Sequence, residues 1–465
     1  MSKLKKKLSI PHTYTIIFAI ILFMTILTWL VPSGQFDTKE TDDGKTIVVA
    51  GSYHEVASNP QGVDDFFTAP IKGIINAGET IGFVLIVGGA FGVINRTGAI
   101  EAGIGRAAKI FGKKELFIIP LCMILFGLGG TTFGMCEETL PFYMIFIPLM
   151  MAMGYDSLTG LSIVYIGAAA GTAASTVNPF SVGLAQSLAG LAPGSAIVYR
   201  GVIWVIMMTV SITFVLFYAK KVKKNPEKSL VYHLDQENRE TLLGASTEIK
   251  PFTKKDGAVL AVFGIGMAVM VWGVLAQGWY TKEISMIFVM IGVFGGIVGR
   301  LNQAEIADSF IDGSKDLIYA ALVIGLARAI IIIAQDGKII DTILNGAANM
   351  LGGLPKAVFA NIMLVVQNII SFFVPSSSGH AALTIPIMAP LGDLVGVSRQ
   401  NIVTAFQFGT GITSFITPTN GVLMASLTMA KIPWTKFLKY VLPLVLILWI
   451  IGAIALTVGL QLFPA

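Results

Sequence analysis

The sequence is poor in charged residues, cysteine and histidine. Only 13% of the residues are charged and 54% are hydrophobic, whereas a soluble domain carries about a quarter charged residues. The two cysteines, Cys122 and Cys136, lie in apolar stretches, so no disulfide framework is indicated. The four histidines are scattered, and neither His-Glu-x-x-His nor Gly-x-Ser-x-Gly occurs, which argues against a membrane enzyme. These shortages exclude an ordinary soluble domain.

Long apolar stretches point to a membrane protein. Several of them reach the roughly 20 residues that a helix needs to cross a bilayer. We predict nine crossings, at about 12–31, 70–95, 158–190, 196–218, 257–276, 283–299, 316–335, 400–430 and 437–462. Gly-x-x-x-Gly spacings, as at Gly88 and Gly92, suit close packing of such helices. The predicted fold class is an all-α polytopic membrane protein.

Two further apolar stretches, 115–153 and 357–395, do not have the pattern of simple spans. Each contains a polar, glycine-rich middle, at 129–138 and 374–380. Irregular backbone exposed to lipid would leave amide groups unpaired at several kcal/mol each. We therefore predict two re-entrant hairpins whose tips are buried in protein or line a wet cavity. Amphipathic segments near 99–112 and 338–352 would lie along the interface.

Basic residues predict the orientation of the chain. With the N-terminus in the cytoplasm, nine crossings place 1–7, 96–114, 219–256, 300–315 and 431–439 on the cytoplasmic side, and these segments hold 23 of the 32 Lys and Arg residues. The basic residues behind the net charge of +5 are therefore explained by the orientation of the chain in the membrane. They do not indicate nucleic acid as a partner. We expect a multi-pass protein of the bacterial inner membrane, with the lipid bilayer and a small-molecule substrate as its partners.

The two halves of the chain repeat each other weakly. A shift of 242 residues aligns several identical residues, among them Pro148 with Pro390 and Asn178 with Asn420. The number of identities barely exceeds chance, but the matched Pro, Gly and Asn residues fall at the predicted breaks. We predict a first repeat at 1–218, a cytoplasmic linker at 219–256 and a second repeat at 257–465. Five crossings separate the two copies, so the repeats would be inverted, as in secondary transporters.

Each predicted repeat contains a broken helix. The segments 171–181 and 411–421 interrupt apolar spans with hydroxyls, an asparagine and a proline. Unwound backbone at mid-membrane frees carbonyls to coordinate Na⁺ and directs helix N-termini at an anionic group. The alternative is a proline kink satisfied by neighbouring Ser and Thr side chains.

The breaks, the hairpin tips and one intramembrane arginine supply the candidate site. The candidate substrate ligands are Glu137, Glu138, Ser175, Thr176, Asn178, Arg328, Ser377, Ser378, His380, Thr417, Thr419 and Asn420. The candidate Na⁺ ligands are Thr131, Thr132, Ser175, Asn178, Ser376, Thr417 and Asn420.

The charged members of this set have structural alternatives. Inserting an arginine at the centre of a membrane helix costs about 2.5–3.5 kcal/mol, so we expect Arg328 either to pair with another group or to have a function. Its planar fork suits a carboxylate, but a buried ion pair between helices is the other reading. Glu137 and Glu138 would hold an ammonium group, carry a coupling proton, or simply cap the returning leg of the hairpin. His380 lies opposite Glu138 in the repeat and would be either a proton carrier or a structural residue.

Several motifs resemble the YfcC-like transporters. They are the stretches 85–92, 133–138, 381–384, 389–397 and 405–409. This family is related to the anaerobic C4-dicarboxylate carriers and the arginine/ornithine antiporters of the ion-transporter superfamily. The resemblance implies an elevator-type carrier that is commonly a homodimer. Where the family has Gly-Phe-Ala-Lys, this chain has Gly325-Leu326-Ala327-Arg328, so specificity at that position is not carried over.

The predicted function is secondary active transport of a small charged organic solute, as an ion-coupled symporter or an exchanger. Two acidic residues and one arginine suit a cargo with both ammonium and carboxylate groups, which favours an amino acid of the arginine/ornithine type. The alternative is a C4-dicarboxylate carrier, although a dianion would be repelled by ionised Glu137 and Glu138. No cofactor is expected beyond coupling Na⁺ or H⁺. A channel would not require inverted halves with two hairpins.

Overall fold

The fold is almost entirely helical. The computed structural model describes residues 13–40, 46–49, 51–103, 106, 116–192, 194–238, 252–279, 281–351 and 354–464. Six helices in this part of the chain are long and apolar enough to cross a membrane, and three shorter apolar helices accompany them. The chain is therefore a helical membrane protein, and the count of nine crossings stays a prediction.

The described helices run in a similar order in the two halves, although α12 has no counterpart in the first half and the strands after α1 have none in the second. The first half contains α1 (Thr13–Leu30), α2 (Val63–Asn76), α3 (Gly78–Arg96), α5 (Ile118–Phe133), η2 (Glu137–Thr139), α6 (Leu140–Ala152), α7 (Ser157–Ala173), η3 (Pro179–Gly183), α8 (Leu184–Leu188) and α9 (Ile197–Lys224). A connecting segment contains η4 (Pro226–Lys228) and α10 (Tyr232–Glu237). The second half contains α12 (Lys254–Gln277), α13 (Thr281–Val298), α14 (Gln303–Asp316), α15 (Ile318–Asp336), α16 (Ile340–Leu351), α17 (Lys356–Phe373), α18 (Ser377–Val395), α19 (Arg399–Ser414), α20 (Gly421–Met429) and α21 (Trp434–Leu462).

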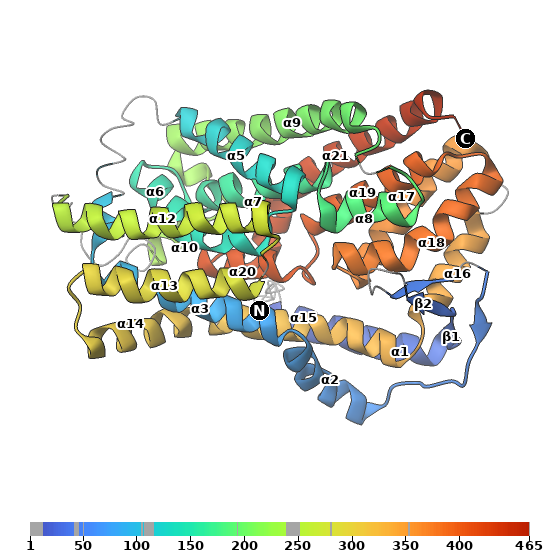
Figure 1. Cartoon of the computed structure of the whole chain (residues 1–465), viewed down its shortest axis with the longest axis horizontal. Coiled ribbons are helices and arrows are strands. Elements are labelled where there is room, and N and C mark those ends of the chain that lie inside the picture. Colours follow the sequence, from blue (N-terminus) through green and yellow to red (C-terminus); the bar gives the residue numbers. More distant parts are fainter. Residues whose placement is uncertain are drawn as a thin grey trace, which may run out of the picture.

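The helices form two bundles, which lie one above the other in Figure 1. The lower bundle contains α1, α2, α3, α13, α14 and α15, in which α2 packs on α15 and α3 packs on α14, and α12 packs on α13. The upper bundle consists of α5 to α9 and α17 to α21, in which α5 packs on α7 as α17 packs on α19. The packing of α5 on α7 in the first half thus resembles the packing of α17 on α19 in the second half. A repeated unit would produce this correspondence.

Glycines allow the closest helix contacts in the lower bundle. A Cβ added at Gly313 of α14 would lie 2.2 Å from the Gly88 oxygen of α3, and one added at Gly73 of α2 would lie 2.2 Å from the Gly325 oxygen of α15. Real Cβ atoms are not found at such distances, so larger residues would force these helices apart. The Gly88/Gly92 spacing is therefore a packing feature here.

Both apolar stretches with polar middles form two helices with a short non-helical joint. α5 ends at Phe133 and is followed by Gly134, which adopts a left-handed conformation (φ 75°), before η2 and α6. α17 ends at Phe373, and α18 begins at Ser377 with Ser376 as its N-cap. The predicted broken helices are also broken, between α7 and η3 and between α19 and α20. The breaks thus fall where the polar residues interrupt the apolar pattern.

Some elements differ from the prediction. Four short strands, β1 (Gly34–Gln35), β2 (Thr38–Glu40), β3 (Thr46–Val48) and β4 (His54–Glu55), form two antiparallel pairs in the segment after α1. The segment 300–315, which was predicted only as a cytoplasmic connection, contains most of the helix α14, which is capped by Asn302 and Glu305. The amphipathic segment at 338–352 is the helix α16, whereas most of 99–112 lies outside the described residues.

Candidate functional site

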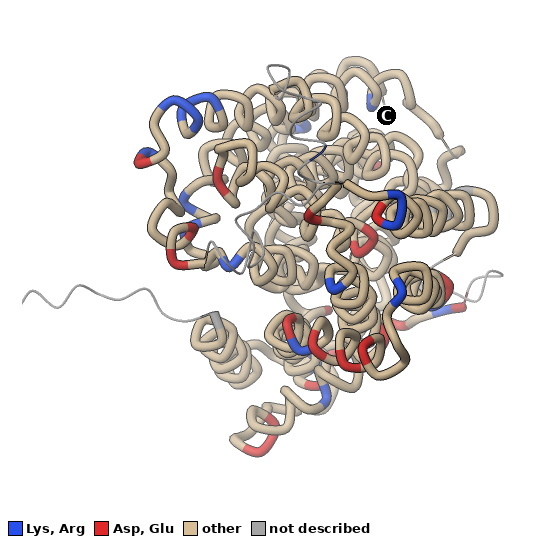
Figure 2. Tube along the Cα trace, turned by 90° about the vertical axis from the view of Figure 1, so that its left-hand side faces the viewer, with Lys and Arg blue, Asp and Glu red and all other residues tan. Residues whose placement is uncertain are grey.

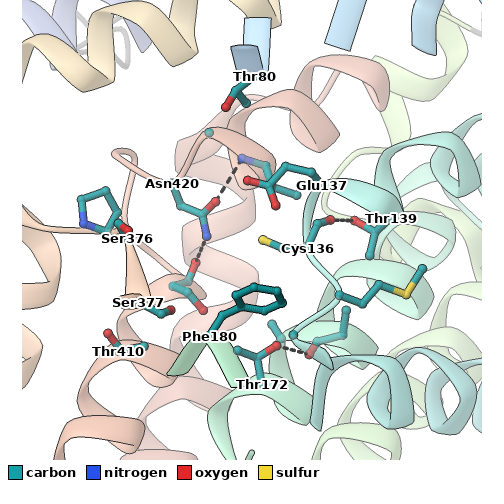
Figure 3. A pocket seen from close by; sticks show the side chains of 18 of the residues that line it. Thr80, Cys136, Glu137, Thr139, Thr172, Phe180, Ser376, Ser377, Thr410 and Asn420 are labelled. Carbon is teal, nitrogen blue, oxygen red and sulfur yellow. Dashed lines mark hydrogen bonds between the residues drawn. The ribbon is translucent and has the colours of Figure 1, made fainter. Parts of the chain in front are cut away.

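A cavity of about 370 Å³ lies where the two bundles meet. This volume falls within the usual range for small-molecule sites. Its walls come from both hairpin tips, both helix breaks and the lower bundle, so segments far apart in sequence converge on it (Figure 3). The cavity thus lies at the one place where all the polar interruptions of the apolar spans come together.

Helix N-termini surround the cavity. Asn178 caps η3 by accepting a hydrogen bond from the Phe180 amide at 2.9 Å. Asn420 caps α20 by accepting from the Val422 amide at 3.0 Å and the Leu423 amide at 3.2 Å. The two asparagines that the repeat alignment matched therefore perform the same local task. Their caps satisfy amide groups that unwinding would otherwise leave unpaired.

The two glutamates have different surroundings. Glu138 is buried, and its Oε2 accepts a hydrogen bond from the Cys136 amide at 2.9 Å, so it caps the start of the returning leg of the hairpin. Glu137 is only half-buried and lines the same cavity. In Figure 3 the Glu137 and Asn420 side chains reach toward the same space from opposite sides. Of the two acids, Glu137 is the one whose carboxylate is more available to a bound molecule.

Arg328 lines the opposite wall, on α15 of the lower bundle. Its Nε donates a hydrogen bond to Oδ1 of Asn76 at the end of α2. None of the ion pairs found among the described residues joins Arg328 to Glu137 or Glu138. Because Nε donates to Asn76, the two terminal nitrogens of the guanidinium are the ones that could donate hydrogen bonds to a carboxylate.

The predicted site residues fall into two groups. Those that line the cavity are Glu137, Glu138, Asn178, Arg328, Ser376, Ser377, Ser378, Thr419 and Asn420. Those that lie behind its wall are Thr131, Thr132, Ser175, Thr176, His380 and Thr417.

The second group is engaged in local hydrogen bonds. Thr131 Oγ1 donates to the Ala174 oxygen at 3.2 Å and accepts from the Thr176 amide at 3.0 Å, tying the first hairpin to the first break. Ser175 Oγ donates to the Thr172 oxygen at 2.8 Å. The residues of this second group were candidates because the sequence places them at or near the predicted breaks and hairpin tips. The sequence does not show whether a side chain at such a position points into the cavity or away from it. Their role as ligands stays a prediction.

Several lining residues were not among the candidates. Asn76 and Thr80 come from the junction of α2 and α3, Trp279 precedes α13, and Tyr165 and Thr410 come from the middle of α7 and α19. Asn76 and Thr80 both fall within the predicted span at 70–95, and Trp279 lies between two predicted spans. Tyr165 and Thr410 lie on long buried helices, where a single polar residue does not reveal which face it occupies.

The chain is similar to known proteins over nearly its whole length. Residues 10–461 match the sequence model of the family described as DcuC, the C4-dicarboxylate anaerobic carriers. The Escherichia coli (strain K12) protein named "Putative basic amino acid antiporter YfcC" is 38% identical, covering 99% of this chain and 98% of that protein. A Haemophilus influenzae protein named "Uncharacterized protein" is 34% identical, covering 99% of both chains.

Two solved structures are distantly similar. They are the YdaH transporter of Alcanivorax borkumensis and MtrF of Neisseria gonorrhoeae, each with 16% identity and a TM-score of 0.42. The alignments cover 97% of this chain, and 99% and 95% of those chains respectively. So distant a likeness carries no argument about the site. The match over nearly the whole sequence confirms the predicted resemblance to YfcC: the protein is a membrane transporter rather than an enzyme, and it belongs to the C4-dicarboxylate anaerobic carrier (DcuC) family.

Proposed function

We propose that this secondary transporter carries an amino acid of the arginine/ornithine type. The observation that supports this most is the placement of opposite charges in one cavity. Glu137 lines it from the upper bundle and Arg328 from the lower bundle, and no ion pair among the described residues joins them. A cargo with both a carboxylate and a cationic group would pair its carboxylate with Arg328 and its cationic group with Glu137. The name of the Escherichia coli relative, a basic amino acid antiporter, is consistent with this cargo.

A C4-dicarboxylate is the second candidate. The family description names this class of cargo. The N-termini of η3, α18 and α20 face the cavity together with Arg328, and helix N-termini stabilise anions. Against it stands Glu137, which would repel a second carboxylate unless it binds a proton.

Coupling and architecture belong to the same proposal. Asn178, Ser376 and Asn420 line the cavity and carry side-chain oxygen atoms, so they are the candidate Na⁺ ligands best placed for coupling. The matched order and packing of the elements in the two halves support inverted repeats, and the division into two bundles with the cavity between them supports an elevator-type motion of one against the other. A homodimer follows from the family resemblance alone.

The orientation proposal has the N-terminus in the cytoplasm of a bacterial inner membrane. Figure 2 looks at the left end of Figure 1, and Lys and Arg colour the near ends of several helices there. The last turn of α9, with Lys221, Lys223 and Lys224, and the start of α12, with Lys254 and Lys255, belong to segments predicted as cytoplasmic.

Ligand-induced stabilisation of the purified protein tests the cargo. A ligand present at about 100 times its Kd stabilises the folded state by about 2.7 kcal/mol. We expect ornithine or arginine to raise the melting temperature, and succinate to have no effect. Glu137→Gln should remove the shift produced by ornithine while the ligand-free melting temperature stays close to that of the wild type. A wild-type shift with succinate and none with any amino acid would overturn the proposal in favour of a dicarboxylate.

A further inference from the structure

A buried histidine connects three helices directly behind the cavity wall. His380 of α18 is fully buried. Its Nε2 lies 2.6 Å from Oε1 of Gln367 in α17, and its Nδ1 lies 2.8 Å from Oγ1 of Thr410 in α19. The ring also packs edge-on against Phe406, with centroids 5.1 Å apart. Both polar partners of the ring are neutral, and the ring has no freedom to turn.

These two hydrogen bonds determine which ring nitrogen of His380 carries the proton. The amide oxygen of Gln367 accepts hydrogen bonds only, so Nε2 of His380 must be the protonated nitrogen. The amide orientation is supported by its other end, since Nε2 of Gln367 lies 3.7 Å from the Met363 sulfur, a weak acceptor. In the neutral imidazole Nδ1 is then an acceptor, and the hydroxyl hydrogen of Thr410 points at it.

The hydrogen bond to His380 limits the role that the Thr410 hydroxyl can play toward other groups. Its hydroxyl has one hydrogen, which is committed to His380, so the oxygen offers only lone pairs to its other neighbours. One neighbour is the Ser371 hydroxyl, at a long 3.4 Å. Thr410 is also one of the residues that line the cavity (Figure 3).

We propose that Thr410 is a binding residue for the side-chain cationic nitrogen of the cargo, and that His380 is the positioning residue that fixes Thr410 as a hydrogen-bond acceptor. Ammonium and guanidinium groups are donors only, so they need acceptors. This inference rests on the proposed amino-acid cargo and deepens it. Glu137 and Thr410 would serve the two cationic groups of a basic amino acid, while Arg328 serves its carboxylate.

A pair of ligands isolates the Thr410 contact. Ornithine and norvaline differ at the end of the side chain, where ornithine has an ammonium group. Thr410→Val keeps the shape and removes the acceptor, so ornithine affinity should fall about 10- to 100-fold, the effect of losing one hydrogen bond to a charged group. Norvaline affinity, measured by competition against radiolabelled ornithine, should not change. Thr410→Ser, which retains the hydroxyl, should restore ornithine binding.

The role of His380 is tested by a double-mutant cycle. His380→Phe retains a ring against Phe406 but releases the Thr410 hydrogen, so it should also weaken ornithine binding selectively. If it acts through Thr410, the combination with Thr410→Val should be no weaker than Thr410→Val alone. Gln367→Met, which leaves the imidazole in place but removes its orienting acceptor, should lower ornithine affinity in the same direction.

Four results would overturn the inference. Equal losses for ornithine and norvaline would show that Thr410 does not contact the terminal ammonium. Additive losses in the double mutant, or a lower melting temperature with unchanged affinity, would show that His380 is structural. A loss confined to the Na⁺ dependence of ornithine binding would assign Thr410 to the coupling ion. A wild type that binds no amino acid would instead overturn the proposed cargo, which separates the two failures.

Discussion

At the scale of single residues, Arg328 and Asn76 form a pair whose geometry predicts recognition of a carboxylate. Asn76 accepts a hydrogen bond from Nε of the guanidinium, and Arg328 lines the cavity. Arg328→Lys keeps the charge but loses the planar fork, so cargo affinity should fall about tenfold or more without loss of folded protein. Asn76→Ala should lower affinity less, because only the orientation of the fork is lost. Equilibrium binding of labelled cargo measures both.

Lys72 supplies the matched control for this substitution. It lies on the same helix as Asn76 and pairs with Asp336 at 2.7 Å, but both side chains are well exposed. Surface ion pairs contribute about 0–1 kcal/mol, so Lys72→Gln should change neither affinity nor stability measurably. If Arg328→Ala proves strongly destabilising and Glu137→Gln rescues it, the two residues pair in another state and the substrate role of Arg328 is wrong.

At the scale of elements, the two capping asparagines should matter more for transport than for stability. Asn178→Ala and Asn420→Ala each remove the cap of a helix that begins at the cavity, at a cost of about 1 kcal/mol. We expect inserted, folded protein in which uptake of cargo into proteoliposomes is abolished. Asn302→Ala removes an equivalent cap from α14, away from the cavity, and should leave uptake intact. Near-normal uptake by both cavity mutants would mean that the breaks are only kinks.

The glycine contacts between α3 and α14 give a second prediction at this scale. Gly313→Ala should destabilise the protein by about 1–3 kcal/mol, because its Cβ would overlap the Gly88 oxygen. Gly264→Ala in α12 is the control, since no heavy atom lies within 4 Å of a Cβ built there, and a helix gains from alanine in place of glycine. Thermal unfolding in detergent measures both. Equal melting temperatures would show that the two helices can separate without cost.

Sequence predicted the elements better than it predicted the directions of side chains. Apolar length and polar interruptions located the joints between α5 and α6 and between α17 and α18, as well as both helix breaks, because the polar residues mark where the apolar helices are interrupted. The strands after α1 were missed, since the longest has three residues and no alternating apolar pattern. Within the site, hairpin tips and caps were found, but Thr410 was not, because it is one polar residue on a buried helix.

At the scale of the whole molecule, the order of crossings fixes which end of the bundles faces the cytoplasm. If the nine-crossing proposal holds, the strand-containing segment after α1 lies outside and the connecting segment with η4 and α10 lies inside. Ala57 and Lys228 are exposed residues of these two segments. In a background with Cys122 and Cys136 replaced, Ala57→Cys should react with an impermeant thiol reagent in intact cells. Lys228→Cys should react only after the cells are lysed, because the membrane then no longer separates it from the reagent. Equal labelling of both positions in intact cells would contradict the proposed topology, since an extra or missing crossing anywhere between them moves them to the same side.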